Sequence, residues 1–408
     1  MKKSLIALAA LAAVGAASAQ SSVTLYGLVD IGYGQHTTTS RDGSNTIRSR
    51  GVLEGNNASN RIGFRGTEDL GGGLKANFLV ETGISPTSNE LFATRLVAGG
   101  HQVTGQVANG AFSTSTNRQS FLGLTSATIG TFNIGRQYTL ADDLASLSGY
   151  NIGAENSPGA TAHLAGMLSG PGNILGTRSN SLVYVSPNFG GGFVAKGQYG
   201  SGNGREVVES TNALSGNGLT SAKERLLAVM LQYTNGPVSA AAVYSNVRKQ
   251  TANVIAGINQ PIGSSINAFG VQTPGGGAVL TGQDRTGNLF QLGGSYDFGV
   301  AKVAGTYNTG KTGGTATSTV SSRVRAYQIG VSAPFGAIVP FVSLGRYYTT
   351  PDGAARTEDN KQYQIGVRYS MSKRTTAYAI YGEERNDAAV GAAFYKDRKG
   401  SVGVSHSF

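Results

Sequence analysis

The chain has 408 residues, of which 61 are glycine, none is cysteine and only 13% are charged, with a formal net charge of +11. The missing cysteines exclude zinc-finger, iron–sulfur, thiol-nucleophile and disulfide-framework proteins. So much glycine with so few charges fits neither a helical enzyme nor a disordered chain, and no apolar run beyond the N-terminus reaches the ~18 residues of a membrane-spanning helix.

The N-terminus has the three parts of a secretory signal peptide. Lys2 and Lys3 form a basic start, residues 5–14 form an apolar core too short to span a bilayer, and residues 17–19, Ala-Ser-Ala, form a small-residue cleavage site. The alternative is a buried N-terminal helix, which this layout disfavours. We therefore expect an exported protein with a signal peptide at 1–19 and a single domain at 20–408.

From residue 23 onward the dominant pattern has a period of two, as in strands with one apolar face. In the first such segment Val23, Leu25 and Val29 lie on one face, while Thr24 and Asp30 lie on the other. Similar alternation returns at residues 62–65, 74–81, 227–233, 290–297, 327–332, 363–369 and 402–408. No stretch of the mature chain shows a convincing helical stripe.

Short turns alternate along the chain with long connections rich in Gly, Ser, Thr and Asn, among them residues 35–57, 138–176 and 249–287. The segments between them number sixteen, and those at Asn117 and Ile129 alternate least clearly. Their starts are Val23, Ala58, Leu74, Asn117, Ile129, Thr177, Phe193, Glu224, Val238, Asn288, Val300, Val324, Ile338, Gln362, Thr375 and Gly400. The predicted fold class is all-β: a transmembrane antiparallel β-barrel of sixteen strands, with short periplasmic turns and long outer loops.

A soluble β-sandwich would also alternate, but it would place charged residues on its polar face. Here that face is mostly Gln, Ser, Thr and Gly. Aromatic residues also gather near the short turns, as in the interfacial girdle of a membrane barrel. They are Phe189, Phe193, Tyr233, Tyr296, Phe298, Phe335 and Tyr369. Strands cross a membrane only as a closed sheet, and sixteen of them leave a water-filled channel inside.

Several motifs of the chain resemble the general porins of Gram-negative bacteria, in the betaproteobacterial and neisserial branch. The most specific is the sequence RIGFRGTEDLGGGLKA at residues 61–76. Further motifs lie at residues 22–27, 130–136, 184–190, 372–375 and 404–408. The resemblance implies a homotrimer in the lipid of the cell outer membrane, in which each protomer has its own pore for passive diffusion of small hydrophilic solutes.

The resemblance also implies the residues of the pore constriction. The third outer loop, residues 138–176, is expected to fold inward and to carry acidic side chains that face a row of arginines, with a carboxylate on the wall. By motif position these are Asp142, Asp143 and Glu155 on the loop, and Arg61, Arg118, Arg178 and Glu81 on the wall. Phe408 matches the C-terminal signal that the family's barrel-insertion machinery reads.

The period-two count assigns three of these residues to the inner face without help from the resemblance. Arg61 is out of phase with Phe64, and Glu81 is out of phase with Phe78 and Val80. Arg178 is out of phase with Val183. Other basic residues that land on the inner face are Lys75, Lys196, Lys302 and Arg368. An arginine that faced lipid at mid-membrane would cost ~2–4 kcal/mol. A net positive lining raises the local concentration of anions, so we expect a weak to moderate preference for anions.

Residues 305–312 match the phosphate-loop pattern, but no helix-forming run follows, so nucleotide binding is not expected. The four histidines lack metal-ligand spacing, and neighbouring carboxylates such as Asp142 and Asp143 are more often solvated than catalytic. We therefore expect no catalytic residues, no cofactor, no metal and no nucleic-acid partner. Two alternatives stay open: a substrate-specific channel, and an outer-membrane barrel enzyme with a triad at its rim.

Overall fold

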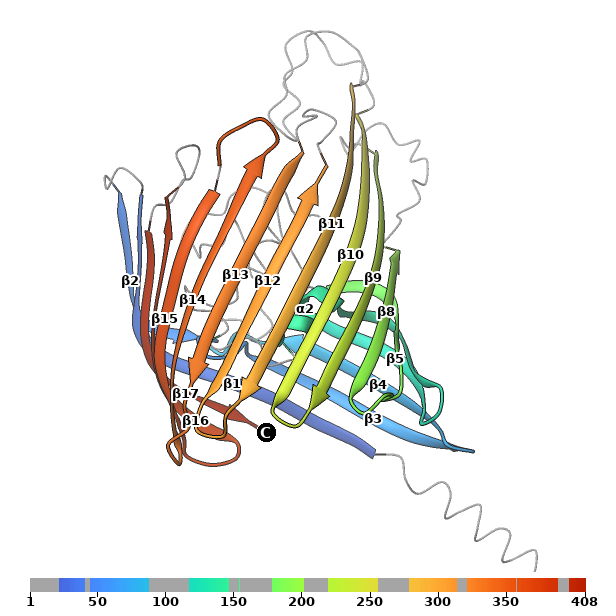
Figure 1. Ribbon diagram of the computed structural model, residues 1–408, viewed down its shortest axis with the longest axis horizontal. Helices are drawn as coiled ribbons and strands as arrows, with labels where there is room; N and C mark the ends of the chain where they lie inside the picture. The colour runs from blue at the N-terminus through green and yellow to red at the C-terminus, as the bar shows by residue number, and fades with distance from the viewer. Residues whose placement is uncertain are drawn as a thin grey trace, which may run out of the picture.

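Antiparallel strands make up nearly all of the chain that the structure, a computed structural model, describes (Figure 1). It describes residues 22–40, 45–87, 117–146, 154, 178–201, 219–255, 279–313, 321–356, 358–387 and 396–408. The predicted signal peptide, residues 1–19, lies outside this part.

The first half of the sheet contains the strands β1 (Ser22–Thr39), β2 (Thr46–Glu54), β3 (Arg61–Gly71), β4 (Leu74–Gly83), β5 (Asn117–Ser126), β6 (Gly130–Tyr138), β7 (Arg178–Val185), β8 (Phe193–Ser201) and β9 (Leu219–Asn235). The second half contains β10 (Val238–Ile255), β11 (Val279–Asp297), β12 (Lys302–Thr312), β13 (Ser322–Ser332), β14 (Ile338–Pro351), β15 (Glu358–Ser370), β16 (Thr375–Asn386) and β17 (Lys396–Ser407).

The sheet closes into a ring of sixteen strands, as the sequence predicts. Each strand from β3 to β16 pairs with the next one along the chain. β1 pairs with β17 on one side, and the N-terminal part of β1 pairs with β3 on the other. Phe408 completes the seam, because its backbone N–H and carbonyl both hydrogen-bond to Gly27 at 3.1 Å. The short turns lie together at the end of the barrel that is nearest the C-terminus (Figure 1).

The structure has one strand in addition to the sixteen of the ring. This strand, β2, corrects the prediction that residues 35–57 form a loop. It pairs with the upper half of β1, from Ile31 opposite Glu54 to Thr39 opposite Thr46. Residues on one face of a regular strand are an even number of positions apart. Ile47 and Val52 are five residues apart and yet both are 60% exposed, because Gly51, with a φ of 155°, interrupts the alternation between them. The predicted loop at 249–287 is likewise shorter, since β10 continues to Ile255 and β11 begins at Val279.

Glycine permits the tight turn between β3 and β4. Gly72 and Gly73 have φ angles of 60° and 79°, the left-handed values that a two-residue hairpin turn needs at both central positions. A side chain at either position would strain this turn. This turn therefore follows from the glycines that the sequence places between the two strands.

The apolar residues of the alternating segments point outward and are exposed, as they are in a barrel surrounded by lipid. Leu122, Ile134 and Val229 are between 54% and 64% exposed, whereas the inward-facing Gln291 and Gln364 are fully buried. This arrangement is the reverse of a soluble β-sandwich, which buries its apolar face in a core. The turn-proximal aromatics Phe298 and Phe335 are also exposed, at 60% and 67%.

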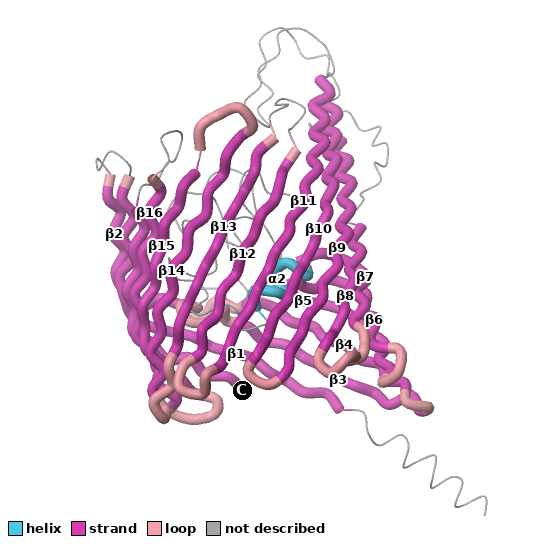
Figure 2. The backbone as a smooth tube through the Cα atoms, viewed as in Figure 1, coloured by secondary structure: helices cyan, strands magenta, loops and turns pink. Residues whose placement is uncertain are grey.

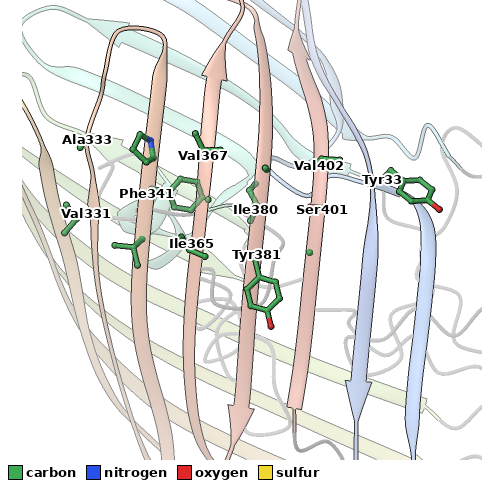
Figure 3. A pocket seen from close by; sticks show the side chains of 15 residues that line it. Tyr33, Val331, Ala333, Phe341, Ile365, Val367, Ile380, Tyr381, Ser401 and Val402 are labelled. Atoms are coloured by element: carbon green, nitrogen blue, oxygen red, sulfur yellow. The ribbon is translucent and has the colours of Figure 1, made fainter.

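The outer surface of β13–β17 contains an open apolar groove of about 840 Å³ (Figure 3). Outward-facing side chains from neighbouring strands line it, including Val342, Ile365 and Val402. The groove exists because Ala379 and Gly400 are smaller than the residues paired with them, Val402 and Tyr381. It lies on the apolar outer surface, where lipid chains can fill it, so the functional site has to be sought on the inner wall.

Candidate functional site

Arg61 and Glu81 lie on the inner wall, on adjacent strands. Their outward neighbours Phe64 and Val80 are 49% and 48% exposed, while the Glu81 side chain is almost fully buried. The Arg61 Nε lies 3.9 Å from a Glu81 carboxylate oxygen. The period-two prediction for these two residues is confirmed.

Tyr26 of β1 provides a third contact to this carboxylate. Its hydroxyl donates a hydrogen bond to Glu81 Oε2 at 3.0 Å. The ring of Tyr26 lies over Gly63, where a Cβ atom would come within 2.7 Å of the ring. A glycine at 63 therefore lets the ring lie flat on the wall and the hydroxyl reach Glu81.

Arg118 reaches Glu81 because β5 has a bulge at this point. The pairing of β4 with β5 shifts between Glu81, which is opposite Gln119, and Thr82, which is opposite Asn117, so Arg118 is the extra residue of the bulge. In a bulge two successive residues oppose one on the neighbouring strand, which interrupts the alternation. The Arg118 Nε then donates to Glu81 Oε1 at 2.7 Å. The bulge also explains why this segment alternates poorly in the sequence.

Tyr138 joins Arg118 to Arg178. Its hydroxyl oxygen accepts hydrogen bonds from Nη2 of Arg118 at 2.7 Å and from Nη2 of Arg178 at 3.2 Å. The Arg178 guanidinium also lies 4.7 Å from the centre of the Tyr138 ring, in cation–π geometry. We call Arg61, Glu81, Arg118, Tyr138 and Arg178 the arginine cluster.

Arg178 belongs to this cluster for a different reason from the one the sequence suggested. Its predicted inward orientation assumed that Val183 faces lipid, but Val183 is 6% exposed and Leu182 is 44% exposed. The alternation in β7 therefore has the opposite phase to the predicted one. Arg178 joins the cluster through Tyr138, at the first residue of β7.

The arginine cluster carries three guanidinium groups against one carboxylate, a formal charge of +2. Arg136 adds a further guanidinium beside it and donates from Nε to the carbonyl oxygen of Asn117 at 3.0 Å. Sequence reasoning missed Tyr138 and Arg136. Tyr138 lay at the edge of a predicted loop, where strand alternation gives no signal.

The third loop begins with a short helix, α2 (Leu140–Ser146), that lies inside the barrel (Figure 2). This helix was not expected, because its seven residues are too few to show a helical stripe in the sequence. Its first turn is held by Thr139, whose carbonyl oxygen accepts the backbone N–H of Asp143 at 2.9 Å. The Gln198 side chain of β8 accepts the N–H of Leu140 at 2.9 Å.

One face of α2 is apolar and packs on an apolar part of the inner wall. The helix contributes Leu140 and Leu144, which are 2% and 0% exposed. The wall contributes Leu226, Ala228, Met230, Ala241, Val243 and Val247 from β9 and β10. Burying a leucine side chain contributes roughly 1.5–3 kcal/mol, so these contacts hold the start of the loop against the wall.

The two predicted loop carboxylates on α2 have different surroundings. Asp143 is buried and its Oδ2 lies 2.5 Å from the Lys196 ammonium nitrogen. Burial raises the pKa of Asp143, and the Lys196 ammonium opposes this effect. Asp142 is half-buried on the same turn. Glu155, the third predicted carboxylate, lies outside the described residues.

The loop is attached to a second wall at Ala154, next to Glu155 in the chain. The backbone N–H of Ala154 donates to Gln364 Oε1 at 2.5 Å, and Gln364 Nε2 donates back to the Ala154 carbonyl oxygen at 3.4 Å. Gln364 is on β15, whereas α2 packs on β9 and β10. The described parts of the third loop thus contact the inner wall of the later strands, while the arginine cluster lies on β3–β7.

Other predictions about chemistry can be compared with the structure. The phosphate-loop letters at 305–312 lie within strand β12, not at the start of a helix. Among the described residues, no group of three or more His, Cys, Asp or Glu side chains is arranged to hold a metal ion. In the same residues, no helix is both long and apolar enough to cross a membrane.

An outward apolar surface, a closed ring of sixteen strands and charged side chains on the inner wall define a membrane channel. Comparison with known proteins agrees with this class. A family model described as Gram-negative porin matches residues 6–389. The chain belongs to the Gram-negative porin family, and it is an outer-membrane protein that forms a water-filled channel for small hydrophilic solutes.

Its relatives include two outer-membrane porins that match it over most of their length. Outer membrane porin protein 32 of Delftia acidovorans is 30% identical over 93% of this chain and 88% of its own length. An outer membrane porin protein of Bordetella pertussis is 29% identical over 100% of both chains. Among solved structures, an anion-selective porin from Comamonas acidovorans has a TM-score of 0.64 at 22% identity, covering 95% of this chain and 100% of that one. The relatives are channels, not enzymes.

Proposed function

We propose that this porin is a passive diffusion channel with a preference for anions, and that the arginine cluster forms one side of its constriction. The carrying observation is the formal charge of +2 on the cluster at the inner wall. Exposed charges act over roughly 8 Å at physiological ionic strength, so a solute that passes the cluster within that range meets a positive potential. The structurally similar porin from Comamonas acidovorans is described as anion-selective, which agrees with this proposal.

The opposite side of the constriction is formed by the third loop. Asp142 is the carboxylate of α2 that would contribute, because it is only half-buried. Asp143 is buried and forms an ion pair with Lys196. In this proposal Asp142 faces the guanidinium groups and sets up a transverse field. Polar solutes and water align in such a field, whereas apolar solutes disturb that order.

The proposed assembly is a homotrimer without enzymatic activity. A structural neighbour, OmpT of Vibrio cholerae, is described in a trimer form, and the relatives named above are channels. Phe408 is the proposed signal for the barrel-insertion machinery, supported by its exposed outward ring, 42% exposed, at the turn end of the seam. Loss of trimer bands on heating in a gel, together with hydrolase assays, tests these points.

The experiment that tests the main proposal is a planar-bilayer recording of purified protein across a salt gradient. Anion preference gives a reversal potential of the corresponding sign, and cation preference rejects the proposal. The same recording addresses a substrate-specific channel. Saturable block of the conductance by one solute class, absent for others, would favour that alternative.

A further inference from the structure

The wall next to β1 is interrupted between β2 and β3. On β1 the pairing steps from Leu28, opposite Arg61, to Ile31, opposite Glu54. On β1 only residues 29 and 30 lie between these two pairings, whereas residues 55–60 connect β2 to β3. The additional residues cannot fit in the plane of the sheet. We call residues 55–60 the inner segment, because its contacts are to inward-facing side chains.

Asp30 holds the inner segment with both its backbone and its side chain. Its carbonyl oxygen accepts the N–H of Gly55 at 2.9 Å, and its N–H donates to Asn60 Oδ1 at 2.5 Å. Its Oδ2 accepts the N–H groups of Asn57 and Ala58, both at 3.0 Å. One residue thus fixes both ends and the middle of the segment. The Asp30 side chain is fully buried, and such a carboxylate requires donors of this kind.

The remaining carboxylate oxygen of Asp30 accepts the hydroxyl of Tyr378, on β16, at 2.6 Å. Tyr378 reaches across β17 because the two residues in its path are glycines. Gly403 is paired with Tyr378 on one side and with Gly32 of β1 on the other. A Cβ at Gly403 would overlap the Tyr378 ring, and one at Gly32 would lie 3.0 Å from its hydroxyl. The two glycines thus leave space for the Tyr378 ring.

Tyr378 also belongs to a buried cluster that includes a residue of the third loop. Its side chain is 4% exposed and belongs to a buried cluster with Ala154, the loop residue that Gln364 holds by its backbone. The other members of this cluster are Ala304, Phe341 and Ile380. Arg61 of the arginine cluster directly follows the inner segment. The hydrogen bond between Asp30 and Tyr378 therefore joins the element that precedes Arg61 to the buried cluster that includes Ala154 of the third loop.

We propose that Asp30 and Tyr378 are positioning residues of the pore, whose hydrogen bond keeps Arg61 and the third loop in register across the constriction. Closure of the barrel does not explain this arrangement. The ring of sixteen strands is already closed by the pairing of β1 with β3 and with β17. A buried carboxylate and an inner segment beyond what closure needs indicate a role inside the pore. This inference rests on the proposed function.

The test is Tyr378→Phe, which removes the hydroxyl and keeps the ring. The matched control is Tyr381→Phe, on the same strand but 37% exposed on the outer face, where its hydroxyl bonds Glu383. Single-channel recordings should show Tyr378→Phe spending about tenfold more time in conductance sublevels, the shift expected when one hydrogen bond to a charged group is lost. The control should match the unmodified porin. Both variants should keep the heat-modifiable gel mobility of a folded barrel.

A second variant separates this reasoning from a general loss of stability. Asp30→Asn, which replaces the charged acceptor of the Tyr378 hydroxyl with a neutral amide, should produce the same kind of sublevels. The double variant with Tyr378→Phe should show less than the sum of the two single effects, because the two residues share one interaction. Additive effects of Asp30→Asn and Tyr378→Phe, or a quiet Tyr378→Phe channel, would overturn the inference. An unmodified protein without conductance would instead reject the proposed function.

Discussion

Replacing Arg118 with glutamine is the most direct test of the arginine cluster. Arg118 is the central residue, since it donates to Glu81 at 2.7 Å and to the Tyr138 hydroxyl at 2.7 Å. The change lowers the formal charge of the cluster from +2 to +1. A unit charge about 8 Å from a passing ion in water contributes about 0.5 kcal/mol, favourable for an anion and unfavourable for a cation.

The charge stabilises an anion and destabilises a cation by the same free energy. The anion-to-cation permeability ratio therefore changes by the sum of the two contributions. The expected decrease is about sixfold in dilute salt and about twofold at physiological ionic strength, where the Debye length is about 8 Å. The assay is the reversal potential across a salt gradient, measured at two ionic strengths.

The control for this measurement is Lys311→Gln. Lys311 is at the end of β12, half-exposed and paired with Asp352 at 3.3 Å, so its replacement removes the same charge at a distance from the cluster. Equal decreases for the two variants, or a decrease that does not depend on salt, would refute the assignment of Arg118 to the constriction.

Three further outcomes are expected. Leu144→Ala should weaken the docking of α2 by about 2–5 kcal/mol and increase open-channel noise, without changing the heat-modifiable gel mobility of the barrel. Burial raises the pKa of Asp143 against the opposing effect of Lys196, so acidification through that pKa neutralises the carboxylate and adds one positive charge to the pore. Anion preference should therefore rise as the pH falls through it, and Asp143→Asn should show the higher preference without this step. Leu122→Arg, which places a charge on an outward residue that is 60% exposed, should destabilise the barrel in lipid by about 2–4 kcal/mol, measured by urea unfolding in liposomes.

The sequence predicts the barrel well because period-two alternation is a direct result of strand geometry with lipid on one face. Segments such as residues 227–233 therefore show which residues point outward, and Val229 and Met230 lie on the predicted faces. The prediction fails where backbone geometry changes the alternation. Strand β2 was assigned to a loop because Gly51 disturbs its pattern.

The candidate site was predictable in part for the same reason. Arg61 and Glu81 lie in regular strands, and their phase gives the inner wall. Arg118 needs a bulge and Arg178 needs Tyr138 as a partner, and neither requirement is visible in residue spacing. Only the resemblance to porins predicted Arg118, and alternation assigned Arg178 to the inner face from a wrong phase for Val183. The contacts of Asp30 with the inner segment depend on tertiary structure and leave no periodic signal.

The seam between β1 and β17 has a consequence for how the protein is made. Twelve residue pairs join these strands, from Leu28 opposite Ser407 to Thr39 opposite Lys396, although they lie at opposite ends of the barrel's sequence. Until β17 is added, the edge of β1 that will pair with it has unpaired backbone N–H and carbonyl groups. The free edge of the most recently added strand has them too, and both edges can pair with another chain. Contacts so distant in sequence also form slowly. The protein therefore depends on protection of its first strand while nearly the whole barrel is delivered.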